Sequence, residues 1–375
     1  MAIKVDSTIA AKARKLGSGD LDKCYHCGIC TATCPLSEDG VSFPRTVVRN
    51  LQLGLKSKLM ESSEPWLCYY CGDCSDACPQ NAEPAESVMA ARRYLTSLYD
   101  WTGLSYKMYT SKAWEFGAVL GLGAVVVLLF VLFHGPMPTA LTAEGGVRLN
   151  SFAPAHIIEL FDLAMGGILS MFLLSNLARM VKHVMGDDLK KISPKVYLSK
   201  LTELPVQFAT QKRWKECEDT HMWKKHLLLV CGYVTMFIMI MGFLRWFQTD
   251  TVHPFWHPQR LLGYFATFAL LYVTGDMMVG RYKKKRAMHK FSHSTDWLFL
   301  IMLFLTALTG ILVHIFRVNG FPMSTYVTYV IHMAVLVPML MIEVPFGKWS
   351  HLAYRPLTSY LHKVKQAASA QNVPG

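Results

Sequence analysis

The hydrophobic pattern divides the chain into a polar N-terminal part and a longer part with six apolar stretches. These stretches cover residues 114–133, 155–177, 226–247, 261–279, 297–316 and 326–342. Each is close to the roughly 20 residues that a helix needs to cross the hydrocarbon core of a membrane. The pattern therefore predicts six transmembrane helices and not the buried helices of a soluble protein.

The connections between the apolar stretches alternate in basic content. The first, third and fifth carry at most two Lys or Arg residues each, whereas the second carries eleven and the fourth six. Because basic connections stay in the cytoplasm, six crossings predict that both termini are cytoplasmic. The N-terminus has no apolar segment of signal-peptide length. We therefore expect a multi-pass protein of the cytoplasmic (inner) membrane.

The polar part is expected to be helical as well. The segment "FPRTVVRNLQLGLKSKLM" has apolar residues at helical spacing and little strand alternation. The predicted class is all-α, with a cytoplasmic domain over residues 1–110 and a transmembrane domain in contact with lipid over residues 111–375.

Composition and charge agree with a membrane protein. Hydrophobic residues make up 52% of the chain and charged residues only 17%. The net charge of +12 does not indicate nucleic-acid binding, because residues 1–113 hold 13 basic and 12 acidic residues and the surplus lies between the apolar stretches. The excess is a topology signal.

Eight of the ten cysteines form two copies of one motif. "CYHCGICTATCP" begins at Cys24 and "CYYCGDCSDACP" at Cys68. Each reads C-x2-C-x2-C-x3-C-P, the spacing of ferredoxins with two [4Fe-4S] clusters, in which the fourth cysteine ligates the other cluster. Glycine at positions 28 and 72 suits a tight turn around inorganic sulfide. The expected ligands are Cys24, Cys27, Cys30 and Cys78 for cluster 1, and Cys68, Cys71, Cys74 and Cys34 for cluster 2.

Zinc and disulfides fit this pattern less well. Structural zinc usually uses two C-x2-C pairs and does not need a third cysteine two residues on. Disulfides are rare in a reducing compartment. Cys217 and Cys231 lie outside the motif and are expected to be unligated thiols.

The two copies begin 44 residues apart, with a helical segment between them. This arrangement resembles the α-helical ferredoxin domain of heterodisulfide reductase C subunits and of fumarate reductase iron-sulfur subunits. The resemblance covers roughly residues 20–90 and rests mainly on the eight cysteines. It implies clusters but no particular pathway.

Histidines in membrane spans usually bind something or line a polar cavity. His332 is expected near the outer end of the sixth stretch, and His351 lies just past its inner end. Nineteen residues of helix extend ~28 Å, which would place one histidine near each membrane face. With "PFGKWSH", this region resembles the last helix of respiratory nitrate reductase gamma subunits and of heterodisulfide reductase-type cytochrome b subunits.

That resemblance implies two haem b groups. An earlier helix in the family supplies two partner histidines ten residues apart, but the third stretch has His226 at the first position and Met236 at the second. His226 and His351 are thus expected to ligate an inner haem. His332 is expected to ligate an outer haem, whose sixth ligand could be Met236, His314, His156, water or quinone.

A quinone site is predicted in "AHIIELFD" at the start of the second stretch. Histidine and carboxylate side chains can hydrogen-bond a quinone and move its protons. The candidates are His156, Glu159 and Asp162. The alternative is a helix end whose polar residues meet lipid headgroups.

The combination of domains indicates electron transfer without a substrate reductase site. No G-x-G-x-x-G nucleotide fingerprint follows a predicted strand, and the Cys-Cys-Gly signature of heterodisulfide-cleaving subunits is absent. Over nearly its whole length the chain resembles the membrane subunits of quinone-interacting membrane-bound oxidoreductase complexes of sulfate reducers.

This resemblance implies electron flow between menaquinone or menaquinol and soluble flavin- and cluster-containing subunits related to heterodisulfide reductase A. Adenylylsulfate reductase would be the final partner. Two alternatives remain at this point: the membrane subunit of a heterodisulfide reductase complex, or a redox sensor or anchor that carries no electron flux.

Overall fold

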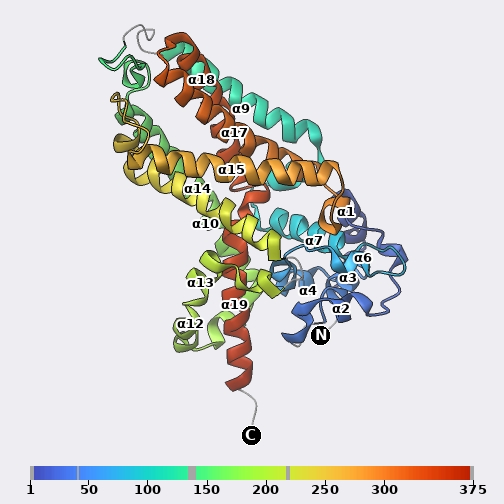
Figure 1. Cartoon of the computed structure of the whole chain (residues 1–375). Coiled ribbons are helices and arrows are strands. Elements are labelled where there is room, and N and C mark those ends of the chain that lie inside the picture. The colour runs from blue at the N-terminus through green and yellow to red at the C-terminus, as the bar shows by residue number, and fades with distance from the viewer. Residues whose placement is uncertain (1–3, 40–41, 134–140, 217–219, 372–375) are drawn as a thin grey trace.

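The protein is built from helices throughout. The computed structural model describes residues 4–39, 42–133, 141–216 and 220–371. Within these ranges there is no strand, and only an isolated antiparallel bridge joins Leu141 to Val147. The predicted all-α class is confirmed. Short N-terminal helices gather beside one end of a bundle of long helices (Figure 1).

The N-terminal helices pack around one central helix, α7. Val47 and Leu51 of α3 share a core with Val88 and Ala91 of α7, and all four are fully buried. The predicted helical segment between the cysteine copies is present as α3 and α4. The helices are α1 (Ile9–Lys15), α2 (Ile29–Thr33), α3 (Arg45–Gln52), α4 (Lys56–Glu61), α5 (Glu64–Leu67), α6 (Asp73–Asp76), α7 (Pro84–Tyr99) and α8 (Leu104–Thr110).

Six helices are long and apolar enough to cross a membrane, one for each predicted stretch. Several extend past the predicted limits because the helix continues into polar residues beyond the apolar segment. The six are α9 (Lys112–Phe133), α10 (Ala155–Met185), α14 (Thr220–Phe247), α15 (Pro258–Tyr282), α17 (Ser294–Val318), and α18 (Pro322–Pro338) with the π-helical turn Met339–Glu343.

The long helices pack as neighbouring pairs. α17 lies against α15 and α18, α14 against α15 and α10, and α18 also against α9. At the α14–α15 contact, a Cβ added to Gly232 would lie only 2.7 Å from the Cβ of Ala269. Small residues of this kind allow close approach of membrane helices.

The sixth span does not continue as one helix to His351. The α-helix ends at Pro338, a π-helical turn follows, and the 3-10 turn Lys348–Ser350 leads into α19 (His351–Gln371). Pro345 and the extended backbone of Gly347 interrupt the helix. His332 therefore lies at the middle of its span and not near the outer end, and the expected helical separation from His351 does not apply.

Helix α19 joins the two parts of the molecule. Its residues Tyr354 and Leu361 share a core with Trp66 and Tyr99 of the N-terminal part and with Met180 of α10. The long second connection forms α11 (Asp188–Lys191), α12 (Pro194–Lys200) and α13 (Glu203–Thr210), and α12 and α13 pack against α19 (Figure 1). The fourth connection contains the short helix α16 (Ala287–Lys290).

Candidate iron-sulfur and haem sites

The two cysteine copies share an unusual local backbone. Gly28 and Gly72 have φ values of 89° and 95°, and His26 and Tyr70, at the matching places before them, have 58° and 60°. Glycine enters this left-handed region without steric cost. The turn is followed at once by α2 or α6, and these two short helices pack against each other.

The cysteines of the two copies are interleaved. The fourth cysteine of each copy lies with the first three of the other copy, so the structure brings together the two predicted sets. The thiols close enough to raise the pKa of Cys30 are Cys24, Cys27 and Cys78. Those that raise the pKa of Cys74 include Cys68, Cys71 and Cys34. Within the described residues, no three His, Cys, Asp or Glu side chains could hold a single metal ion.

The chemistry of these sites fits a polynuclear cluster. Burial raises the pKa of the Cys34 thiol to about 12, and burial also raises the pKa of Cys30. Thiolates here would need the positive charge of bound iron. The backbone N–H groups of Tyr70 and Ala82 donate to the sulfur atoms of Cys68 (3.2 Å) and Cys78 (3.4 Å). Such donors influence cluster potentials.

The structure also brings together His226 and His351, whose ring centroids are 6.4 Å apart. The Nδ1 atom of His226 is 2.8 Å from Oε1 of Gln211, and Nδ1 of His351 is 2.5 Å from the carbonyl oxygen of Lys348. Because both oxygens only accept, each Nδ1 donates, and the lone pair of each Nε2 is available to a metal.

The separation of the two rings suits one metal between them. Imidazole nitrogens lie about 2 Å from a metal such as zinc, so two rings on opposite sides of an ion have centroids roughly 6 Å apart. The residues present thus fit an axial haem pair. Beside the pair, at the contact with the N-terminal part, lies a cavity of about 150 Å³.

Three of the outer haem candidates line a larger cavity of about 970 Å³. His332 lines it, and its Nδ1 is 2.9 Å from the hydroxyl of Thr309. Met236 and His314 line the same cavity, but Nε2 of His314 already bonds Arg260 (3.1 Å) and Tyr264 (3.0 Å). His314 is therefore less available to a metal than Met236. His156 is exposed and is not among the residues that line this cavity.

The three predicted quinone residues have different surroundings. His156 is exposed, whereas Glu159 forms an ion pair of 2.6 Å with Arg245. Only Asp162 is buried and lines the large cavity. The structure therefore does not bring the three side chains into one pocket. The polar group of His314, Arg260 and Tyr264 at the same cavity was not predicted, because its members lie on two helices.

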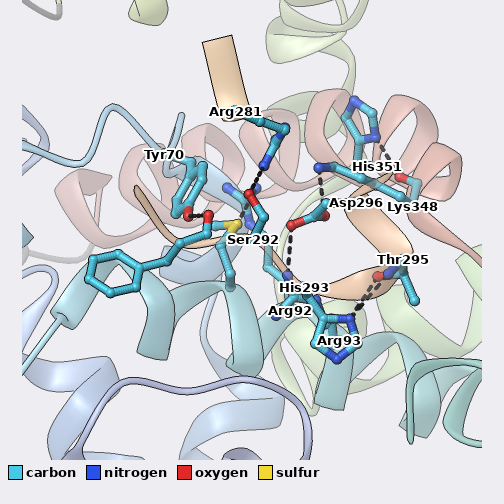
Figure 2. Close-up of polar contacts among 12 residues, drawn as sticks. Tyr70, Arg92, Arg93, Arg281, Ser292, His293, Thr295, Asp296, Lys348 and His351 are labelled. Atoms are coloured by element: carbon cyan, nitrogen blue, oxygen red, sulfur yellow. Dashed lines mark hydrogen bonds and ion pairs between the residues drawn. The ribbon is translucent and has the colours of Figure 1, made fainter. Parts of the chain in front are cut away.

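Sequence reasoning also missed a buried charge cluster beside His351. The carboxylate of Asp296 accepts from Arg93 (3.1 Å) and from Lys348 (2.6 Å), as Figure 2 shows. The three residues come from α7, from the start of α17 and from the turn before α19. Because these ion-pair partners are far apart in the sequence, they do not form a local motif that could be recognised. The cluster holds the N-terminal part against the membrane helices.

The two cysteines outside the motif lie apart from these sites. Cys231 is an exposed thiol on α14, and Cys217 lies outside the described residues. The eight cysteines of the two copies are thus the thiols that the structure gathers into the cluster sites.

The interleaved cysteines on a helical scaffold define an iron-sulfur electron-transfer protein. Residues 20–82 match the family model of the 4Fe-4S dicluster domain. The chain is 39% identical over 69 residues to the iron-sulfur C subunit of the CoB--CoM heterodisulfide reductase of Methanopyrus kandleri. The match covers 18% of this chain and 36% of that protein.

A second relative is the C subunit of the H(2):CoB-CoM heterodisulfide,ferredoxin reductase of Methanothermobacter thermautotrophicus. It is 28% identical over 62 residues, covering 16% of this chain and 34% of the relative. The chain thus spans about a third of the length of these relatives. No solved structure is significantly similar to the chain.

Proposed function

We propose that the chain is a membrane electron-transfer subunit that relays electrons between menaquinone or menaquinol and a soluble flavin- and iron-sulfur-containing oxidoreductase. Two [4Fe-4S] clusters and haem b would carry the electrons. In this proposal the N- and C-termini are cytoplasmic and the helices cross the cytoplasmic membrane. The proposed setting is dissimilatory sulfate reduction, with soluble subunits related to heterodisulfide reductase A and adenylylsulfate reductase as final partner.

The observation that carries the proposal is the arrangement of His226 and His351. Their Nδ1 atoms donate to Gln211 and Lys348, and their rings are 6.4 Å apart at the end of the bundle nearest the cysteine domain. Supporting oxygens of this kind fix the orientation of metal-bound imidazoles. Two histidines held this way beside a dicluster domain favour a relay over an isolated ferredoxin.

The proposed division of labour among the residues is simple. Bound iron and haem would supply reversible one-electron chemistry. The cysteines would hold the clusters, His226 and His351 would hold and orient the inner haem, and His332 with Met236 would hold the outer haem. Asp162, at the large cavity, is the predicted quinone residue best placed to exchange a proton there.

A second candidate comes from the relatives themselves. Both are subunits of heterodisulfide reductases, so the chain could serve as the membrane subunit of such a complex. This function would require a Cys-Cys-Gly partner and a thiol-disulfide substrate. Electron delivery to a heterodisulfide by the complete complex would favour this alternative.

The composition of anaerobically purified protein tests the proposal first. We expect about eight non-haem iron, eight acid-labile sulfide and one or two haem b per chain, because each cubane holds four iron atoms and four sulfides. Zinc without sulfide or haem would contradict it.

Substitution of the histidines tests the haem assignment. Replacing His226 or His351 by leucine should lower the haem content by one per chain, measured as the pyridine haemochrome, while iron and sulfide stay unchanged. His332→Leu should remove a different haem. The exposed His156 offers the matched control, and full haem content in the H351L protein would refute the inner pair.

A further inference from the structure

The two cysteine copies are equivalent in sequence and backbone but not in their surroundings. Tyr69, which follows the first cysteine of the second copy, is 6% exposed, whereas the matching Tyr25 of the first copy is 76% exposed. Cys68 and Cys74 are buried, and Cys27 is exposed. One site therefore faces protein and the other faces solvent.

Segments of the membrane domain cover the second copy. Arg355 of α19 lies over the ring of Tyr69, 3.8 Å from its centroid, and the amide of Gln207 donates to the Tyr69 hydroxyl. A Cβ on Gly72 would lie 2.5 Å from that of Ala287. Asp76 forms an ion pair of 2.7 Å with Lys290. Three separate segments, from α13, α16 and α19, thus close over this site.

A continuous set of rings leads from the second copy to the haem histidines. The centroids of Tyr69 and Trp214 are 5.2 Å apart, and those of Trp214 and His226 are 4.8 Å apart. Cys71 packs into the same apolar cluster as Tyr69 and Trp214. These contacts connect the second cysteine set to the inner histidine pair through side chains that touch one another.

The first copy is joined to the second and to the core of the N-terminal part. Cys30 packs in one cluster with Cys74, so the two cysteine sets adjoin each other. Cys24 and Cys34 pack against the core of the N-terminal part. On the open side, Ile29 is 42% exposed next to the exposed Cys27 and Tyr25. An exposed tyrosine and isoleucine suit a protein interface.

We infer that the two clusters act in a fixed order. The cluster of the second copy exchanges electrons with the inner haem, and the cluster of the first copy exchanges them with a soluble redox protein that docks over Tyr25, Cys27 and Ile29. The partner must carry a one-electron centre near its own surface. This inference rests on the proposed function and adds the order of the centres and the exit surface.

The electron balance of this order is one electron per step. A quinol releases two electrons and two protons at the membrane. The transfer between the inner haem and the second site oxidises the haem by one electron and reduces the cluster by one. The transfer between the two clusters again moves a single electron, and no proton needs to cross between the domains.

Solvent access to the two clusters provides a test that does not depend on activity. In the dithionite-reduced full-length protein, soluble Dy(III)-EDTA should enhance the spin relaxation of the first cluster at least fivefold more than that of the second. Cys27→Ser and Cys71→Ser assign the two electron paramagnetic resonance signals, and if one variant does not fold the other still assigns both, because it alters one signal and leaves the other. Equal enhancement, or greater enhancement of the second cluster, would overturn the inference.

The order itself is tested by stopped-flow reduction with menadiol. In the C27S protein, haem and the second cluster should both be reduced at the wild-type rate. In the C71S protein, haem should be reduced while the first cluster receives electrons at least tenfold more slowly. The reverse pattern refutes the order. Absence of haem or clusters from the unmodified protein would instead refute the proposed function.

Discussion

Asp296 lies in the first turn of α17 and binds two cations from distant parts of the chain. The exposed fractions of the Arg93 and Asp296 side chains are both 7%. A carboxylate removed from water in this way persists because both cations pair with it. The pairing also places Lys348 so that its carbonyl orients His351 (Figure 2). At the scale of residues, one acidic side chain supports both the domain contact and the proposed haem site.

Asp296→Asn should therefore destabilise the protein strongly. The substitution leaves Arg93 and Lys348 without their carboxylate, and breaking a buried pair in this way costs about 3–5 kcal/mol. Asp76→Asn breaks the Lys290 pair, in which both side chains are 47% exposed, and should cost less than about 1 kcal/mol. Thermal unfolding of the two variants measures the difference, and equal melting temperatures would contradict it.

Glu86 provides a pH-dependent prediction. Burial raises its pKa from the usual 4.5 to about 7, and it accepts a hydrogen bond from the Tyr70 hydroxyl. Between these two pH values the folded protein binds more protons than the unfolded chain, so stability falls as pH rises through this window. Above a pH of about 7 the full loss of folding stability caused by the ionised, buried Glu86 has been reached.

Glu86→Gln removes this penalty because the amide does not ionise. The stability advantage of the variant over the wild type should grow by about 2 kcal/mol between pH 5 and pH 8, from roughly 1.4 kcal/mol per pKa unit. Other groups with shifted pKa values, such as Glu64, are present in both proteins, so their contributions to the difference in stability cancel. Unfolding midpoints across this range provide the measurement, and a constant difference would show that Glu86 does not titrate there.

At the scale of elements, the same turn serves two different contacts. Gly28 precedes α2 and Gly72 precedes α6, and both have left-handed backbones. The atom nearest to a Cβ at Gly28 would be the flexible guanidinium of Arg45, at 3.3 Å. At Gly72 the nearest atoms belong to Ala287 and to the backbone of Met288. Only the second turn is pressed against another part of the chain.

Alanine substitutions at these two positions should distinguish the stability lost through backbone strain from the stability lost through a steric clash. Gly28→Ala should cost about 1–2 kcal/mol, the usual cost of a left-handed alanine, and should retain its iron. Gly72→Ala should cost more, because the methyl group lies 2.5 Å from Ala287 and must push α16 away. Melting temperature and iron per chain report both effects. Equal behaviour of the variants would mean that the contact with α16 does not matter.

At the scale of the whole molecule, the basic connections and the cysteine domain lie at the same end of the bundle. The second connection supplies Gln207 and Trp214 and the fourth supplies Ala287 and Lys290, and all four cover the second cysteine copy. The positive charge that predicts a cytoplasmic location thus belongs to the segments that hold the electron-transfer domain. The proposed topology and the proposed relay support each other.

The topology predicts opposite labelling of two exposed positions. Phe255, in the third connection, is 63% exposed, and Lys283, after the fourth span, is also exposed. In intact cells a membrane-impermeant maleimide should label the F255C protein but not the K283C protein, because only the third connection faces outward. Permeabilised cells should show labelling of both. The opposite pattern in intact cells would invert the topology.

The sequence by itself determined the helical class, the six spans and the cysteine spacing, since periodicity and motifs are local properties of the chain. It also selected His226 and His351 through a family resemblance. The position of His332 was misjudged, because the start of a helix beyond its apolar core leaves a weak signal. The grouping of His156, Glu159 and Asp162 was likewise inferred from their closeness in the sequence, without knowledge of neighbouring side chains.

Only the tertiary structure decided which surroundings each local motif receives. Two nearly identical cysteine copies differ because the membrane domain closes over Tyr69 and leaves Tyr25 in solvent. The Asp296 cluster and the supporting contacts of His226 and His351 join residues far apart in the chain. Burial and electrostatics depend on distance in space, and no local pattern of residues encodes that distance.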